Sequence, residues 1–297
     1  MRRRTFLIPI VAVVVVGALA GVGAIAWAAT TDTPEQPRAV ATAAPAPAPT
    51  PTPTLDAFPK RPLTAATRYV ALGDSFAAGM GGGSEQGKCV MSDNSYPDVF
   101  STVAGVDLIT NAACSGATTA DLLKRQLLPL DANTDLVTVS IGGNDLGVAA
   151  IASDCAAGKS VPCRNGISSA LSLLNVLPGR LDQVYAAVAK AAPNARIVVT
   201  GYAILYDASD PSAKDFGVAA AINAATIGLN EVIKTAVDKQ RADGVPITYL
   251  GVDFDGHGIG SAKPWVNNLG ITAFHPTAVG YREYSTELVR LLGRAVN

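Results

Sequence analysis

Short apolar runs alternate with amphipathic stretches from Thr67 to the end of the chain. Apolar runs of strand length that are bounded by turn residues are typical of buried strands, and the stretches between them have helical spacing. This alternation predicts an α/β domain whose mostly parallel, five-stranded sheet is covered by helices on both faces. We expect strands at 68–72, 107–111, 136–141, 196–201 and 247–252, and helices at 96–104, 119–128, 168–192, 213–241 and 278–294.

Residues 1–30 precede this body and have the pattern of an export segment. Arg2, Arg3 and Arg4 stand before an unbroken apolar run over 6–29, and Arg3-Arg4 also resembles a twin-arginine motif. The run is long enough to span a bilayer. Cleavage near Ala28 as a signal peptide and retention as an N-terminal membrane anchor are both open. Either outcome places the body outside the cytoplasm, secreted or at the extracellular face of the membrane or cell wall.

Residues 31–62 are rich in proline, alanine and threonine, with alternating Ala-Pro and Thr-Pro pairs. Proline removes backbone donors and favours the extended polyproline conformation, so such a segment cannot bury a core. We therefore expect a disordered linker that acts as a semi-rigid spacer before a catalytic domain at 63–297.

Charge and cysteine content restrict the partners and the compartment. The formal net charge is −1, with 23 Lys and Arg against 24 Asp and Glu, so nucleic acid is not an expected partner. Four cysteines in an oxidising compartment predict two disulfides. Three connectivities are possible, and the simplest joins neighbours, Cys89–Cys114 and Cys155–Cys163. The spacing of cysteines and histidines does not fit a metal site.

The strand expected at 68–72 runs into Gly73-Asp74-Ser75 and then into a glycine-rich segment. A buried strand that ends in a tight turn holds a hydroxyl at the edge of the sheet where ligands bind. Ser75 can act there as a nucleophile if a base reaches it. The alternative is that Asp74 and Ser75 only make hydrogen bonds within the turn, as these residue types do in most loops.

Polar groups follow the ends of other elements as well. Gly116 allows a backbone amide to approach a ligand closely, or is simply a turn glycine. Asn144 follows a Gly-Gly pair and offers a fixed donor, although Asn144 or Asp145 could instead cap a helix. His275 precedes a proline at the entry to the last expected helix. Only one other histidine exists, His257, so a serine that needs an imidazole base must use one of these two.

In this order, Gly73-Asp74-Ser75, Gly116, Asn144 and His275-Pro276 resemble the four motif blocks of the SGNH (GDSL-type) hydrolase superfamily. The likeness runs from about 69 to 284, and the secreted actinobacterial lipases and esterases are the branch most similar to it. It implies a flavodoxin-like three-layer α/β/α sandwich and ester hydrolysis without metal or organic cofactor. By this resemblance Ser75 is the nucleophile and His275 the general base. The Ser75 amide, the Gly116 amide and the Asn144 side chain would form an oxyanion hole.

The chain departs from the pattern of that superfamily in two places. The position three residues before the histidine, often an aspartate, is Thr272, and no carboxylate lies between Asp255 and His275. We therefore expect the Thr272 main-chain carbonyl to accept from the His275 Nδ1–H, which gives a Ser–His dyad. Alternatively, Asp253 or Asp255 reaches across to the ring. Many relatives also carry a third cysteine pair, so the loop after His257 is expected to be looser.

These residues favour an extracytoplasmic serine esterase or lipase that forms an acyl-Ser75 intermediate. An O-acetyl or acyl esterase on cell-wall glycan or glycolipid is an alternative, and so is a phospholipase or thioesterase. A binding module that has kept the fold and lost turnover is the alternative from another class. The expected partner is an ester substrate bound by a monomer, and membrane contact is expected only through an uncleaved N-terminal segment.

Overall fold

The computed structural model describes residues 61–209 and 216–296, apart from a few side chains between 149 and 160. The predicted export segment at 1–30 and nearly all of the predicted linker at 31–62 lie outside the described residues, so both stay predictions. At the start of the described chain, the side chain of Leu63 is buried and its carbonyl accepts the Val296 amide at 2.9 Å. The folded body therefore already includes residue 63.

Five parallel strands form one sheet, as the alternation of apolar runs predicts. Their order is β2-β1-β3-β4-β5, so the chain moves outward from β1 to β2 and then returns to the other side of β1. Strand connections that diverge in this way leave a crevice at the carboxyl ends of the strands, where ligands bind. The strands are β1 (Arg68–Gly73), β2 (Asp107–Asn111), β3 (Leu136–Ser140), β4 (Arg196–Thr200) and β5 (Ile247–Leu250).

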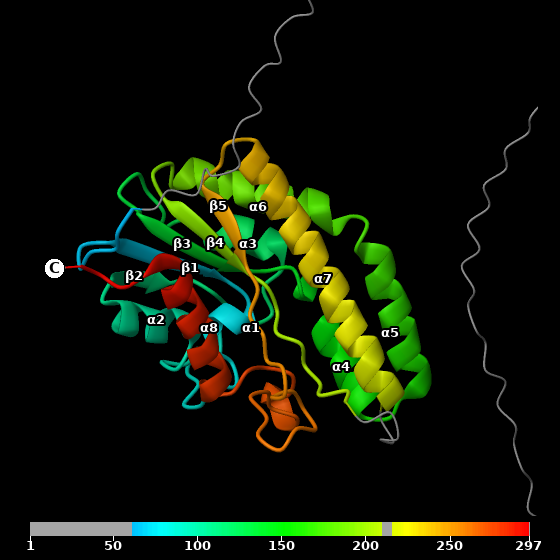
Figure 1. The fold of residues 1–297 in the computed structure, drawn as a ribbon. Helices are drawn as coiled ribbons and strands as arrows, with labels where there is room; N and C mark the ends of the chain where they lie inside the picture. The colour runs from blue at the N-terminus through cyan, green and yellow to red at the C-terminus, as the bar shows by residue number, and fades with distance from the viewer. Residues whose placement is uncertain (1–60, 210–215, 297) are drawn as a thin grey trace, which may run out of the picture. The chain divides into compact units, whose positions relative to one another are not determined.

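Helices cover both faces of the sheet, which gives the predicted three layers (Figure 1). α2 (Tyr96–Ala104) and α8 (Ala278–Leu292) pack together on one face. α3 (Thr119–Arg125), α6 (Leu177–Ala191) and α7 (Phe216–Ala242) lie on the other face. Every residue of β3 and of β4 is buried. Strands that are covered on both sides need apolar residues at successive positions, which explains their continuous apolar runs.

The single helix predicted at 168–192 is wrong. The structure has α5 (Ser160–Leu173) and α6 in its place, and α4 (Val148–Ala156) is a further helix that the sequence pattern does not predict. Pro178 lies in the first turn of α6. Its ring excludes a helical carbonyl four residues earlier and it has no amide hydrogen to donate, so α5 and α6 cannot be one continuous helix.

The start of α3 is set by a capping box at Thr118 and Asp121. Thr118 precedes the helix, and its side chain accepts the Asp121 amide, while the Asp121 carboxylate accepts the Thr118 amide at 3.1 Å. This reciprocal pairing satisfies amides that have no partner within the helix. The helix predicted at 119–128 therefore begins at the expected residue and ends at Arg125.

By length and composition alone, α7 could cross a membrane. Its buried residues recur every three or four positions along one face and include Ala219, Ile222, Thr226, Leu229, Ile233 and Val237. This spacing is that of an amphipathic helix whose apolar face is covered by its own domain. Since α7 packs against α6 and β5, we interpret it as a core helix.

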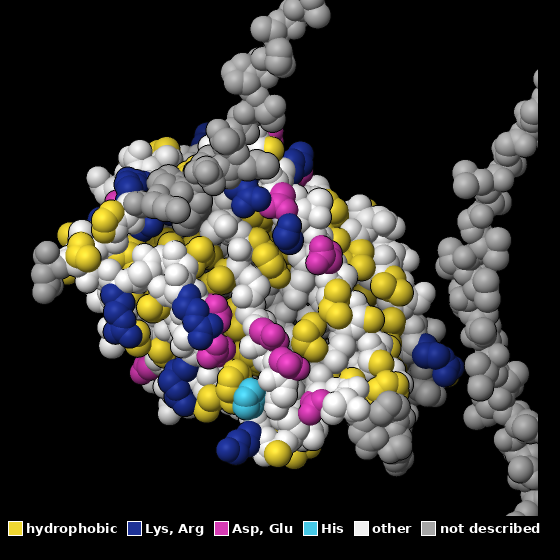
Figure 2. All heavy atoms as spheres, in the orientation of Figure 1, with side chains coloured by type: hydrophobic (Ala, Val, Ile, Leu, Met, Phe, Trp, Pro, Cys, Tyr) yellow, Lys and Arg dark blue, Asp and Glu magenta, His cyan; other side chains and the backbone are white. Residues whose placement is uncertain are grey.

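Side chains of both charges are scattered over the face of the molecule in Figure 2, with apolar side chains between them. This distribution agrees with the nearly balanced composition of the chain, whose formal net charge is −1. The crevice at the carboxyl ends of the strands, and not a charged surface, is therefore the candidate site.

Candidate active site

The turn after β1 carries Ser75, and two buried hydrogen bonds hold the backbone of this turn. Gly73 has a φ of 144°, and a Cβ there would lie 2.3 Å from the Ser140 carbonyl oxygen, so only glycine fits. The side chain of Gln126 accepts the Gly73 amide at 2.7 Å and donates to the Gly73 carbonyl at 2.8 Å. The backbone next to the serine is therefore fixed before a substrate binds.

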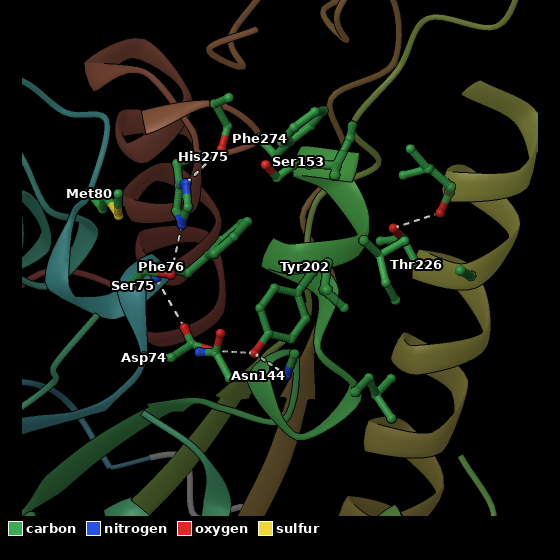
Figure 3. Close-up of a pocket in the computed structure, with 18 of the residues that line it drawn as sticks. Asp74, Ser75, Phe76, Met80, Asn144, Ser153, Tyr202, Thr226, Phe274 and His275 are labelled. Atoms are coloured by element: carbon green, nitrogen blue, oxygen red, sulfur yellow. Dashed lines mark hydrogen bonds between the residues drawn. The ribbon is translucent and has the colours of Figure 1, made fainter. Parts of the chain in front are cut away.

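Asp74 caps the short helix α1 (Ser75–Ala78), which begins at the serine. Its Oδ1 accepts the Phe76 amide at 3.0 Å, and its own amide donates to the Ser140 carbonyl at 2.9 Å. Asp74 therefore does make the turn hydrogen bonds that the alternative interpretation expects. The Ser75 hydroxyl does not, because it points toward His275 (Figure 3).

His275 approaches Ser75 from a loop 200 residues further along the chain. Its Nε2 lies 2.7 Å from Ser75 Oγ, and its Nδ1 lies 3.0 Å from the Ala273 carbonyl oxygen. A carbonyl oxygen can only accept, so in the neutral ring Nδ1 carries the hydrogen and Nε2 presents a lone pair. A base placed in this way can take the proton of a serine hydroxyl.

The surroundings of the site shift the pKa of two of its groups. Burial lowers the pKa of His275 below its usual value, against the effect of the Ala273 and Thr272 carbonyls. A lowered pKa keeps the imidazole neutral and able to accept a proton at neutral pH. Burial raises the pKa of Asp74 to about 7, against the effect of hydrogen bonds from the Tyr202 hydroxyl and the Phe76 amide.

A main-chain carbonyl lies behind His275, and the ring nitrogen is hydrogen-bonded to the carbonyl of Ala273 instead of the expected Thr272. The Thr272 carbonyl accepts the backbone amide of His275 at 3.2 Å, and the ring nitrogen is bonded to Ala273. The chain turns sharply here, because Phe274 has a φ of 68°, in the left-handed region that non-glycine residues rarely adopt. This turn brings the carbonyl of Ala273, rather than that of Thr272, against the imidazole.

The other expected partners of the histidine lie elsewhere. Asp253 accepts the amide of Asp255 at 2.8 Å within its own turn, and no carboxylate in the described part of the chain is hydrogen-bonded to His275. The suggestion that Asp253 or Asp255 reaches across is therefore wrong. His257, the rival base, lies 2.8 Å through Nδ1 from the Lys263 carbonyl, and its ring stacks on Trp265 with centroids 3.7 Å apart.

The proposed oxyanion donors border one cavity. Among the described residues, the amides of Ser75 and Gly116 have no hydrogen-bond acceptor. Asn144 begins the 3-10 turn η1 (Asn144–Leu146) after β3, and its Nδ2 donates one hydrogen to the Ala117 carbonyl at 3.0 Å. That bond orients the side-chain amide, whose other hydrogen is available to a ligand.

A disulfide joins two of the loops at this edge. Cys89 and Cys114 are bonded, and the Ser115 amide donates to the Cys89 carbonyl at 3.1 Å. The bond links the glycine-rich segment after Ser75 to the turn that contains Gly116. The second predicted pair, Cys155–Cys163, stays a prediction because the side chain of Cys155 lies outside the described residues.

Asp145 serves the fold and not the site. Its carboxylate accepts the Thr119 amide at 2.9 Å and the Thr119 hydroxyl at 2.6 Å, and Arg180 lies 3.1 Å from Oδ1. It thereby satisfies an amide in the first turn of α3, which has no partner within the helix. The expectation that this residue makes capping contacts is correct, although the helix concerned is α3.

A cavity of about 730 Å³ opens beside the Ser75–His275 pair. Figure 3 shows Phe76, Tyr202 and Phe274 around the pair and Thr226 of α7 on the opposite side. Its volume lies within the range of roughly 300–1,000 Å³ that is usual for pockets enclosing small molecules. The cavity wall formed by α5, α7 and the segment after α5 is mainly apolar and includes Ile167, Ala170, Leu174, Ile222, Ala225 and Leu229.

Two residues that hold the site escape the sequence analysis. Tyr202 donates to the Asp74 Oδ2 at 2.5 Å. Asn267 donates through Nδ2 to the Gly81 and His275 carbonyls, each at 3.1 Å. Tyr202 has one usable signal, since it follows an expected strand at the same edge as Ser75. Asn267 lies in an irregular loop and has none.

Comparison with known proteins places this geometry among ester hydrolases. The profile of the GDSL-like Lipase/Acylhydrolase family matches residues 71–283. Lipase 1 of Streptomyces coelicolor is 36% identical over 237 residues, 73% of this chain and 83% of the relative. The crystal structure of an extracellular lipase from Streptomyces rimosus has a TM-score of 0.69 at 37% identity, covering 76% of this chain and 99% of that one. Phospholipase A1 of Streptomyces albidoflavus has a TM-score of 0.67 at 36% identity, with the same coverage of 76% and 99%.

Proposed function

Because the chain belongs to the GDSL-like Lipase/Acylhydrolase family, whose members are carboxylic ester hydrolases, we propose that it works through an acyl-Ser75 intermediate with His275 as general base. The observation that carries this proposal is the 2.7 Å contact between His275 Nε2 and Ser75 Oγ at the mouth of an apolar cavity. Membership of this family also favours an active enzyme over a binding module that has lost turnover.

In the first half of the reaction, Ser75 Oγ attacks the carbonyl carbon of the ester and its proton passes to His275 Nε2. The carbonyl oxygen becomes an oxyanion, which the Ser75 amide, the Gly116 amide and the Asn144 side chain stabilise by hydrogen bonds. When the tetrahedral intermediate collapses, the bond to the alcohol oxygen breaks. His275 then returns its proton to the departing alcohol, and the acyl group stays on Ser75.

In the second half, a water molecule attacks the acyl carbon and gives a proton to His275 Nε2. Collapse releases the carboxylic acid, and the proton returns to Ser75 Oγ. Throughout, the Ala273 carbonyl accepts from Nδ1–H, which fixes the tautomer of the ring and stabilises the imidazolium that forms. The proposed unit is therefore a Ser–His dyad supported by a backbone oxygen.

The cavity favours esters with an apolar acyl chain over acetyl groups on glycans. Its wall along α5 and α7 is apolar, and it is much larger than an acetyl group requires. Leu269 and Ile271 border its mouth and are 78% and 84% exposed, so the rim is apolar as well. A glycan would bring hydroxyl groups against these side chains, which costs free energy unless they are hydrogen-bonded. A lipid or phospholipid ester fits the cavity better.

We also propose that the enzyme acts outside the cytoplasm. The Cys89–Cys114 disulfide fits an oxidising compartment, and one of the solved relatives is an extracellular lipase. Residues 1–30 would be the signal or anchor and residues 31–62 the spacer before the catalytic domain. The mass of the protein recovered from its native cells, or its N-terminal sequence, distinguishes cleavage near Ala28 from retention.

Hydrolysis of p-nitrophenyl acetate, butyrate and palmitate tests the proposal, with Ser75→Ala as the matched inactive protein. We expect turnover of all three esters by the wild type, a higher kcat/KM for the longer chains, and no turnover by the variant. Acetylated glycan and phosphatidylcholine then separate the remaining substrate classes. Undiminished hydrolysis by Ser75→Ala would overturn the nucleophile, and a clear preference for acetylated glycan would overturn the substrate class.

A further inference from the structure

Tyr202 connects two turns that come from different strands. It follows β4, and its hydroxyl lies 2.5 Å from Asp74 Oδ2 in the turn after β1. The same hydroxyl accepts the Gly143 amide at 3.0 Å in the turn after β3. All of this is buried, with Asp74 only 1% exposed and Tyr202 7% exposed. One hydroxyl thus satisfies a carboxylate oxygen and an amide of two buried residues.

Each contact lies next to a residue of the proposed machinery. Asp74 immediately precedes Ser75, and its other carboxylate oxygen holds the Phe76 amide on the far side of the serine. Gly143 immediately precedes Asn144, whose side chain is oriented by the Ala117 carbonyl. The tyrosine hydroxyl is therefore a hydrogen-bonded bridge between the turn of the nucleophile and the turn of the oxyanion donor (Figure 3).

The tyrosine is itself fixed in place. Asn230 of α7 accepts the Tyr202 amide at 2.8 Å and donates to the Tyr202 carbonyl at 2.7 Å. The ring packs edge-on against Phe76 with centroids 4.8 Å apart. It also lies so close to Gly143 that a Cβ there would be 3.3 Å from the ring and the hydroxyl. Because the backbone and the ring are both held, the position of the hydroxyl is determined.

The chain provides a comparison that separates this role from ordinary packing. Tyr185 of α6 is also fully buried, and within the described chain its hydroxyl has no hydrogen-bond partner. Both residues supply a ring to the interior, and only Tyr202 uses its hydroxyl to join two turns. Replacing each tyrosine by phenylalanine removes the hydroxyl and keeps the ring. A comparison of the two variants therefore measures the effect of the hydrogen-bonded bridge alone.

We infer that Tyr202 is a positioning residue that holds the Ser75 turn and the Asn144 turn at the separation needed to stabilise the oxyanion. This inference rests on the proposed function. Without the hydroxyl, the Gly143 amide and one Asp74 oxygen lose their partner, and the side-chain bridge between the two turns is lost. The ring that faces the cavity remains in Tyr202→Phe, so substrate binding should change less than the chemical step.

The test compares Tyr202→Phe with Tyr185→Phe in the full-length protein, with p-nitrophenyl butyrate as substrate, well below the melting temperature of both variants. We expect Tyr202→Phe to lower kcat about tenfold to a hundredfold, the size expected of a small displacement of reacting groups, with KM within about twofold. Tyr185→Phe should leave both constants within about twofold of the wild type. Equal kcat values in the two variants, or a Tyr202→Phe effect confined to KM, would overturn the inference.

A second measurement does not depend on turnover. Hydrogen exchange of the Gly143 amide should be faster in Tyr202→Phe than in the wild type and unchanged in Tyr185→Phe, because only the first variant removes its acceptor. Unchanged exchange in both would also overturn the inference. If the wild type hydrolyses no ester at all, the proposed function fails, and the exchange result still decides whether the tyrosine holds the two turns together.

Discussion

The polar edge of the cavity and its apolar wall are built in different ways. The polar edge, residues 73–76, 115–117 and 143–144 with His275, is held by hydrogen bonds to specific partners, such as Gln126 and Tyr202. The apolar wall, formed by α5, α7 and the segment between α5 and α6, presents side chains that make only packing contacts, such as Ile167 and Leu229. Directional bonds fix what chemistry is possible, and packing fixes which acyl chain fits. Substitutions at the polar edge should therefore lower kcat, whereas substitutions in the apolar wall should change the preference for acyl chain length.

The largest expected loss of activity follows from removal of the proposed general base, His275. His275→Ala should lower kcat by about 10³–10⁴-fold or more, because Ser75 then has no group to take its proton. Thr272→Ala, three residues away, should stay within a few-fold, because Thr272 and Ala273 accept hydrogen bonds from the histidine through their main-chain carbonyls. Steady-state kinetics on one soluble ester compares the two. A loss in Thr272→Ala as large as that in His275→Ala would contradict the backbone-supported dyad.

The next largest loss of activity is expected when the proposed oxyanion donor Asn144 is replaced. Asn144→Ala should lower kcat by about 10²–10³-fold with little change in KM, because its hydrogen bond matters when charge develops on the carbonyl oxygen. Far-UV circular dichroism provides the control for folding, since η1 also begins at this residue. A variant that loses affinity for substrate and keeps its kcat would place Asn144 in substrate binding instead.

A substitution in the apolar wall should change the preference of the enzyme for acyl chain length. Ala225→Trp fills the cavity from α7 and should lower kcat/KM for palmitoyl esters at least about tenfold, with acetyl esters nearly unaffected, because the indole takes up volume that a long acyl chain would otherwise fill. Ile227→Trp is the matched control, since Ile227 lies two residues away on the same helix and is 52% exposed. Equal losses for both chain lengths would mean that α7 does not line the acyl site.

The smallest effect is a shift in the pH profile. Burial holds the pKa of His275 below its usual value of 6.5, and the base must be neutral to work. Activity should therefore fall as pH drops through that lowered pKa, and the acid limb of kcat/KM should have its midpoint below pH 6.5. A midpoint near 7 that disappears in Asp74→Asn would instead assign the limb to Asp74, whose pKa burial raises to about 7.

Sequence reasoning locates the polar edge well because its residues belong to short local patterns. The strands and the motifs at their carboxyl ends, Gly73-Asp74-Ser75 and Asn144, are continuous in the chain, and the parallel sheet brings them together. The support of His275 was not predictable in detail. A carbonyl oxygen is present in every residue, and the positive φ of Phe274 decides which one meets the ring.

The apolar wall and the tyrosine bridge are harder to predict for other reasons. α5 contains Pro162, Gly166 and several serines, which are poor helix formers, so its helix depends on packing that a sequence pattern does not show. Tyr202 meets Asp74 across 128 residues, and only the strand order β1-β3-β4 brings them to the same edge.

The proposed mechanism requires Ser75 to become acylated within this cavity. Mixing the protein with p-nitrophenyl palmitate, stopping the reaction in acid and sequencing the peptides by mass spectrometry tests it directly. We expect a palmitoyl group on Ser75, formed in the wild type and absent from Ser75→Ala. An acyl group on another residue, or full turnover by Ser75→Ala without any adduct, would contradict it.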